Sequence, residues 1–338
     1  MHYFNREQAS LRRWTAGPGP CDNAARPLRR GRRAAAPPDR RTEHQVPDPV
    51  PAPRAGTFVF EPTIRAEERK MAEAATAERT LVHYEVREGV AYLTLDDPPA
   101  NTYTYQMMRQ LDDAVLRARF DHDVYVIVLR GMGQKFFCAG ANISMLQNAE
   151  PRFKYYFCLH ANETLNRLEQ TPKLVIAALN GHTVGGGLEI AMAADLRIAK
   201  RDAGKVGLPE INLGVLPGTG GTQRLARLVG KTRAIELMVT GDLLSFERAE
   251  ELDIVNRIFD AEGFDQAIHD FARSFCPPNR ASKAVGRIKR SVQSGAEVPF
   301  ESGLAIEREL QQQLFESGDA REGLDAYVEK RKPDFTGR

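Results

Sequence analysis

Two glutamates stand where a carboxylate could take part in acid–base chemistry. Glu189 comes two residues after three consecutive glycines, Gly185 to Gly187. Glu210 follows a proline in the otherwise apolar stretch GLPEINLGVLPG, residues 207–218. A carboxylate in an apolar pocket has a raised pKa, which suits proton transfer near neutral pH. Taken alone, Glu210 fits a capping role equally well, so the glycines before Glu189 are the stronger signal.

The glycine turn predicts a site that stabilises an anion. It follows an apolar run at 174–179 and leads at once into a helix whose first turn holds Glu189. Glycine lets a ligand approach the backbone closely. A helix amino terminus adds free N–H groups and the positive end of a dipole. Close strand–helix packing is the alternative reason for these glycines. A second segment, KFFCAGANI at 135–143, could supply another backbone N–H beside the turn.

The elements that position these segments can be read from the spacing of apolar residues. Strands are expected at 89–95, 124–129, 174–179 and 196–199. A stripe from Met108 to Ala118 predicts a helix over 104–119, and another helix is expected at 153–169. After Thr219 the expected helices span 219–229, 231–240, 245–252, 263–275, 279–293, 300–316 and 319–330. Strands alternating with helices, then helices alone, indicate an α/β body with a helical carboxyl-terminal region.

Composition argues against several classes of protein. The net charge is +2, but residues up to Lys70 hold 14 basic against 8 acidic side chains, which leaves the remainder mildly acidic. Such a body gives no reason to expect a nucleic-acid partner. Four cysteines without a CxxC pair suit a reducing compartment and favour neither disulfides nor zinc. The sequence shows no apolar run of about 20 residues and no signal peptide pattern, so we expect a cytoplasmic protein without a membrane span.

The amino-terminal part differs in composition from the rest. Residues 1–54 contain 11 arginines, no lysine and 9 prolines. Few aliphatic residues and many prolines predict disorder. A basic binding arm, a transit peptide, or an extension upstream of a native start at Met71 would each explain it. The last is favoured, because prolines oppose the amphipathic helix of a transit peptide. A dinucleotide site is rejected, because neither glycine cluster of the chain has the GxGxxG spacing.

The motifs together resemble the enoyl-CoA hydratase/isomerase (crotonase) superfamily. The segments FCAGANI (137–143), NGHTVGGGLEIAMAAD (180–195), GLPEINLGVLPGTGGTQRLARLVG (207–230) and YVEKRKPDF (327–335) are similar to its signatures, and the resemblance covers residues 82–338. It implies an α/β crotonase (ClpP-like) fold, a superhelix of ββα turns followed by helices. We therefore expect a disordered extension at 1–79, a crotonase core at 80–276 and a helical region at 277–338.

The resemblance also implies roles for individual residues. Ala141 and Gly186 would donate backbone N–H groups to a thioester oxygen, as an oxyanion hole. Glu189 would chiefly activate a water and Glu210 would chiefly deliver a proton. Residues expected to contact the substrate or its CoA are Lys135, Ala139, Gly140, Ile143, Gly185, Leu208 and Pro209. The family mechanism needs no metal and no cofactor, because coenzyme A is part of the acyl-CoA substrate. Family members usually assemble as homotrimers or as dimers of trimers.

This sequence departs from the family pattern at a few positions. Asn142 stands where Asp is frequent, and Leu208 where some hydratases have Gln. Tyr103 and Tyr105 replace smaller residues; they either narrow the pocket or pack at a helix start. Basic residues in SKAVGRIKRSV could meet CoA phosphates or form a solvated helix face: Lys283, Arg287, Lys289 and Arg290. His182 and Asp195 are expected to be structural.

Hydration of a 2-enoyl-CoA is the predicted activity, because both glutamates are present. A double-bond isomerase of the same fold, using Glu210 alone, is the first alternative. An RNA-binding protein that kept the fold is the second, supported by the arginine-rich arm and the basic helix at 283–290. Acyl-chain preference, pathway and the choice between trimer and hexamer stay open.

Overall fold

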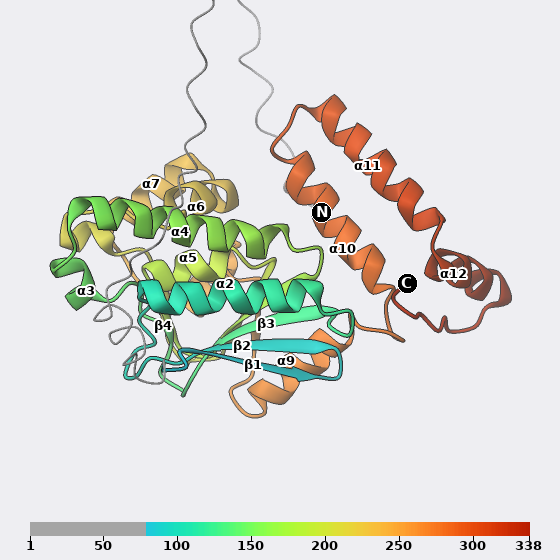
Figure 1. The fold of residues 1–338 in the computed structure, drawn as a ribbon, viewed down its shortest axis with the longest axis horizontal. Coiled ribbons are helices and arrows are strands. Elements are labelled where there is room, and N and C mark those ends of the chain that lie inside the picture. Colours follow the sequence, from blue (N-terminus) through green and yellow to red (C-terminus); the bar gives the residue numbers. More distant parts are fainter. Residues whose placement is uncertain (1–78) are drawn as a thin grey trace, which may run out of the picture. The chain divides into compact units, whose positions relative to one another are not determined.

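A hairpin of β1 (Val82–Arg87) and β2 (Val90–Leu95) opens the part of the chain that the computed structural model describes, residues 79–338 (Figure 1). Its two central residues, Glu88 and Gly89, have positive φ angles of 49° and 82°, which matches the twist of antiparallel strands. The extension predicted for residues 1–79 lies, apart from its last residue, outside the described part of the chain.

Two sheets form the body. The larger has the strand order β1-β2-β3-β5-β7-β10, and all its pairs are parallel except the first hairpin. The smaller has the order β4-β6-β8-β9. The further strands are β3 (Val126–Gly131), β4 (Phe136–Cys138), β5 (Leu174–Leu179), β6 (His182–Val184), β7 (Leu196–Lys200), β8 (Lys205–Gly207), β9 (Leu244–Ser245) and β10 (Arg257–Phe259).

Successive strands alternate between the two sheets. The strand pairs β3–β4, β5–β6 and β7–β8 each place their first strand in the larger sheet and their second in the smaller one. A helical segment follows each pair: α3 (Ile143–Gln147) with α4 (Pro151–Gln170), then α5 (Gly186–Met192), then η1 (Glu210–Leu213) with α6 (Gly221–Val229). Each repeat therefore adds one strand to both sheets, which is the ββα progression that was predicted.

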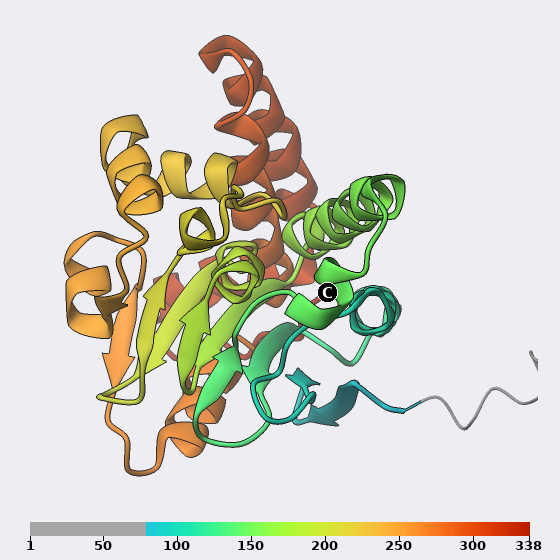
Figure 2. The same ribbon diagram turned by 90° about the vertical axis from the view of Figure 1, so that its left-hand side faces the viewer.

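Both faces of the larger sheet are buried. Within β3, Ile127 and Leu129 belong to one apolar cluster, while Val126 and Val128 belong to another. Helices α2 (Tyr105–Phe120) and α4 supply the first cluster, and α9 (Phe264–Arg273) supplies the second (Figures 1 and 2). Because both faces are covered, the strands of the sheet's centre read as continuous apolar runs.

Helices dominate the chain after Gly220, as predicted. They are α6, α7 (Lys231–Thr240), α8 (Phe246–Glu251), α9, α10 (Ser282–Gly295), α11 (Phe300–Phe315) and α12 (Gly318–Glu329). Helices α10 and α11 lie side by side in Figure 1. The predicted boundary between Cys276 and Pro277 falls in the segment between α9 and α10. The long predicted helices and the four predicted strands are all confirmed within a few residues, whereas β1 and the short strands β6 and β8 to β10 were not anticipated.

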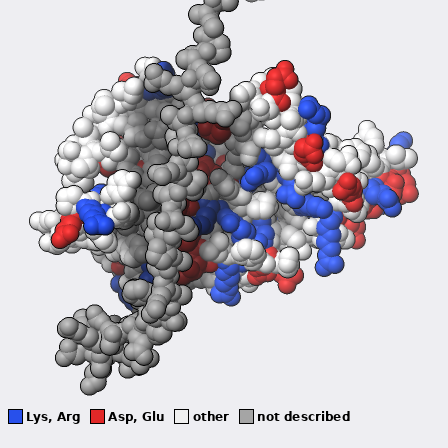
Figure 3. Space-filling model, turned by 45° about the horizontal axis from the view of Figure 1, so that its top comes forward, with Lys and Arg blue, Asp and Glu red and all other residues white. Residues whose placement is uncertain are grey.

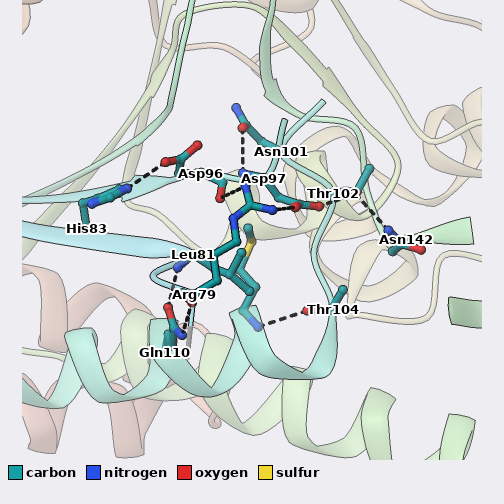
Figure 4. A network of polar contacts seen from close by, with 11 residues as sticks. Arg79, Leu81, His83, Asp96, Asp97, Asn101, Thr102, Thr104, Gln110 and Asn142 are labelled. Carbon is teal, nitrogen blue, oxygen red and sulfur yellow. Dashed lines mark hydrogen bonds and ion pairs between the residues drawn. The ribbon is translucent and has the colours of Figure 1, made fainter. Parts of the chain in front are cut away.

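A polar network fixes the turn that leads from β2 into α2 (Figure 4). Asp97 accepts a hydrogen bond from Thr102 at 3.0 Å, and Asn142 donates to Thr102 at 3.4 Å. The Asn142 side chain also accepts from the Met145 backbone N–H, which caps α3. Asn142 thus ties α3 to the β2–α2 turn.

Candidate active site

A cavity of about 330 Å³ opens where the two sheets meet helices α3 to α6. We name its two sides for later use. The inner wall is the glycine turn with the start of α5, residues 184–189. The outer wall is the segment 209–216, which contains η1, together with Lys154 of α4. Every residue of α5 is buried, whereas Leu213, Val215 and Leu216 are exposed.

Each glycine of the turn is required by a close neighbour. A Cβ on Gly185 would lie 2.9 Å from the Glu210 carboxylate, and one on Gly186 would lie 2.3 Å from the Tyr103 hydroxyl. A Cβ on Gly187 would lie 2.0 Å from the Cys138 carbonyl oxygen. The close packing that sequence analysis offered as the alternative to an anion site is therefore present as well. The two explanations apply together.

Two backbone N–H groups of the cavity lining have no hydrogen-bond partner among the described residues. Gly140 and Gly186 are adjacent, since a Cβ on Gly140 would lie 3.1 Å from the Gly186 nitrogen. The carbonyl of Gly140 accepts from Tyr103 N–H, and Asn142 N–H donates to the Tyr103 carbonyl. Neither Ala141 N–H nor Gly186 N–H makes a hydrogen bond within residues 79–338. Unpaired donors beside each other at a helix start suit a developing negative charge.

Glu189 is held on the inner wall by backbone donors. Its side chain is only 2% exposed. One oxygen, Oε1, accepts from Thr219 N–H and Gly221 N–H, both at 2.7 Å. Burial raises the pKa of Glu189, and these two hydrogen bonds oppose that rise because they favour the charged form. The carboxylate is thus fixed in one orientation beside the free N–H groups.

Glu210 begins η1 and reaches the same cavity from the outer wall. Its Oε2 atom is buried and has no hydrogen-bond partner within the described residues. Burial first, and then the negative charge of Glu189, raise the pKa of Glu210 to about 7. Two neighbouring carboxyl groups whose charges interact titrate as a pair. At neutral pH the pair can therefore hold one proton ready for transfer.

Tyr103 closes the cavity beside Gly186. Its ring is buried, and its hydroxyl lies 2.9 Å from the Thr219 hydroxyl. Tyr105, by contrast, is exposed on α2 and contacts Phe153 and His160. Of the two tyrosines noted in the sequence, the first narrows the pocket and the second packs on the helix surface.

Most of the predicted site residues meet at this cavity. Its lining includes Glu189, Glu210, Ala141, Gly186, Ala139, Gly140, Ile143, Gly185 and Pro209. Two predicted contacts are not in the lining. Lys135 is exposed at the start of β4, and Leu208 is buried in the main apolar cluster.

The basic side chains of the helix predicted at 279–293 do not lie together on one surface. Lys289 is buried in α10, forms an ion pair with Asp195 at 2.9 Å and donates to the Lys173 carbonyl. Asp195 is thus structural, as predicted, and so is His182, which accepts from Lys205 N–H. Lys283 and Arg287 line a different pocket at the carboxyl end of α2. None of these basic residues lines the main cavity.

Among the described residues of the lining, Lys154 is the one charged residue that the sequence did not single out. It is half-buried on α4, and its Nζ lies 3.2 Å from the Cys158 sulfur. Its position in a 20-residue amphipathic helix resembles that of any surface lysine, so only the packing of α4 against the other elements places it in the cavity.

Residues 79–338 contain neither a group of side chains suited to bind a metal ion nor a membrane-spanning helix. No group of three or more His, Cys, Asp or Glu side chains is arranged to hold a metal ion there. In the same residues, no helix is long and apolar enough to cross a membrane.

Comparisons with known proteins show the family to which the chain is similar. The family model described as enoyl-CoA hydratase/isomerase matches residues 85–338. A probable enoyl-CoA hydratase of Bacillus subtilis (strain 168) is 36% identical over 255 residues, which cover 75% of this chain and 97% of the relative. A short-chain-enoyl-CoA hydratase of Clostridium acetobutylicum is 34% identical over 248 residues, covering 73% of this chain and 94% of the relative.

Solved structures give the same result. The crystal structure of an enoyl-CoA hydratase from Geobacillus kaustophilus HTA426 matches with a TM-score of 0.75 and 42% identity, covering 77% of this chain and 98% of that one. An enoyl-CoA hydratase from Bacillus anthracis matches with a TM-score of 0.72 and 30% identity, covering 77% and 100%.

Proposed function

Since the chain belongs to the enoyl-CoA hydratase/isomerase family and has its crotonase fold, we propose that it adds water across the 2,3 double bond of a 2-enoyl-CoA thioester. The single observation that carries this proposal is the meeting of two carboxylates with two unpaired N–H groups in one cavity. Each pair of groups meets one chemical requirement of hydration. The carboxylates move protons, and the N–H groups hold the negative charge that forms on the thioester oxygen.

The free N–H groups of Ala141 and Gly186 are assigned to the thioester oxygen. When a nucleophile adds to Cβ, electron density shifts through Cα to this oxygen, which becomes an enolate. One preorganised donor of this kind contributes about 3 kcal/mol to transition-state stabilisation, or about 10²–10³ in rate. Tyr103 packs against the Gly186 backbone and so fixes the donor's position.

The two glutamates divide the proton transfers. Glu189, oriented by two backbone donors, takes a proton from water as the oxygen forms its bond to Cβ. Glu210, whose pKa is raised to about 7, gives its proton to Cα as the enolate collapses. The product is a 3-hydroxyacyl-CoA: one O–H bond of water and the C=C π bond of the substrate are broken, and one C–O bond and one C–H bond form. The proton on Glu189 then returns to Glu210 through solvent.

The proposed reaction needs no separate cofactor. Hydration changes no oxidation state overall and needs no group besides the CoA carried by the substrate.

We assign a homotrimer or a dimer of trimers to the functional form. Supporting this, α11 has no buried residue, and Tyr327 and Val328 of α12 are 85% and 79% exposed. Apolar surface of this kind is usually covered by a partner, and light scattering after size-exclusion chromatography measures the mass directly.

Hydration of crotonyl-CoA, followed by loss of the enoyl-thioester absorbance, tests the proposal. Wild-type enzyme should be active, and Glu189→Gln and Glu210→Gln should each lower kcat by about 10²–10⁴. Glutamine keeps the size of the side chain, and its oxygen can still accept the bonds from Thr219 and Gly221. An inactive wild type, or two variants that keep most of the activity, would rule out the assigned roles.

Isomerisation of the double bond is the second candidate, favoured by the raised pKa of Glu210 beside the free N–H groups. A 3-enoyl-CoA converted to the 2-enoyl product in a Glu189→Gln variant would support it. RNA binding has weaker support. On the face drawn in Figure 3, basic and acidic side chains of the described residues alternate and no extended basic patch is visible outside the grey atoms.

A further inference from the structure

Lys154 is the only cationic residue among the described residues that line the active-site cavity. Its Nζ lies over the Phe157 ring, 5.6 Å from the ring centroid, and donates to the Cys158 sulfur at 3.2 Å. It forms no ion pair with any carboxylate of residues 79–338. An ammonium group that is partly removed from water without a counterion costs free energy, so its position requires an explanation.

The contacts of Lys154 connect it to the catalytic groups. Cys158, which it touches, packs on Gly218, where a Cβ would lie 3.4 Å from the sulfur. Gly218 directly precedes Thr219, whose N–H holds Glu189. Lys154 therefore lies beside the part of the cavity that holds Glu189. A thioester bound at the N–H groups would place Cβ at the glutamates and the remaining acyl atoms toward the lysine.

The charge of Lys154 also reaches both glutamates. It lowers the pKa of Glu189 and of Glu210, although burial outweighs this effect in both. A plain hydrocarbon tail would leave this ammonium without an anionic partner among the described residues. A second carboxylate on the substrate would enter a cavity that already holds two glutamates, and Lys154 would offset that repulsion.

We propose that Lys154 is a specificity-determining residue that binds a carboxylate at the far end of the acyl chain. The preferred substrates are then 2-enoyl-CoA thioesters of short dicarboxylic acids. This inference rests on the proposed hydration reaction and adds the substrate class. The apolar residues Ile143, Leu146 and Leu213 contact the methylene part of such a chain, and the lysine contacts its end.

Two substrates of matched shape test the inference with the full-length chain. Glutaconyl-CoA ends in a carboxylate, and 5-methyl-2-hexenoyl-CoA replaces the two carboxylate oxygens by methyl groups. For wild type, kcat/KM should favour glutaconyl-CoA by about tenfold or more, as expected for one charge-assisted contact. In Lys154→Met this ratio should fall by about tenfold, whereas Lys154→Arg should keep a preference for glutaconyl-CoA. Lys231→Met, which removes an exposed lysine at the start of α7, is the matched control and should keep the wild-type ratio.

Three outcomes would overturn the inference or separate it from the hydration proposal. If wild type hydrates the methyl analogue as well as glutaconyl-CoA, the carboxylate site is wrong although hydration stands. If Lys154→Met slows both substrates equally, the lysine acts only on the glutamates, and the inference also fails. Calorimetric binding of saturated glutaryl-CoA and 5-methylhexanoyl-CoA needs no turnover. Tighter glutaryl-CoA binding that depends on Lys154, in an enzyme that hydrates neither substrate, would support the site and refute hydration.

Discussion

The two walls of the cavity hold one glutamate each, and they hold them differently. On the inner wall, Glu189 is buried and has two backbone hydrogen bonds. On the outer wall, Glu210 has an oxygen with no partner in the described residues, and its neighbours Leu213 and Leu216 are exposed. The difference indicates that the two walls have different roles in the proposed reaction. The inner wall fixes charge and geometry, and the outer wall holds an exchangeable proton and contacts the variable part of the substrate.

The largest predicted difference in kcat between variants of the two walls should come from adding one methyl group to the inner wall. In Gly186→Ala the new Cβ would lie 2.3 Å from the Tyr103 hydroxyl, so the backbone donor must move. We expect kcat to fall by about 10²–10³, the value of one misplaced oxyanion donor. Steady-state hydration of crotonyl-CoA measures this.

Gly214→Ala is the matched variant on the outer wall. Gly214 has a φ of +70° but nothing within 4 Å of a Cβ, so alanine adds backbone strain of about 1 kcal/mol without a clash. Its kcat should change by less than about tenfold. Equal losses of kcat in the two variants would show that the walls are not distinct.

The smallest effect should come from trimming the outer wall. Leu216 is 67% exposed, so Leu216→Ala should change the free energy of unfolding by no more than about 0.5 kcal/mol. Because Leu216 lines the cavity, KM for a longer 2-enoyl-CoA should rise by roughly threefold with kcat little changed. A large drop in the melting temperature would instead place Leu216 among residues that stabilise the fold.

The sequence predicted the long elements because their apolar spacing is strong. The stripe that ends at Ala118 and the apolar run of β5 are examples. Strands of two or three residues, such as β9 and β4, are too short to show a period. They form because the ββα progression brings them beside partners that are distant in sequence. Their existence depends on tertiary pairing, which local pattern does not contain.

The site residues likewise fall into two groups, those that the sequence could identify and those that it could not. The glycine turn and both glutamates could be identified, because their residue types are unusual in an apolar context. The buried state of Lys289 and the cavity position of Lys154 could not, since a lysine in an amphipathic helix has the same local pattern in either setting. The two lysines differ in their surroundings: Lys289 packs against Asp195 and the residue that precedes β5, whereas Lys154 lies at the cavity.

The pH dependence of kcat/KM for crotonyl-CoA hydration, from about pH 5 to about pH 9, tests the central claim most directly. Glu210 must be protonated to act as the acid, and its pKa is raised to about 7. Activity should therefore fall as the pH rises through that region. Because the charge of Glu189 contributes to the raised pKa of Glu210, Glu189→Gln should move this falling limb to lower pH in the residual activity. Glu210→Gln should abolish the limb. A falling limb that persists unchanged in Glu210→Gln would contradict the account.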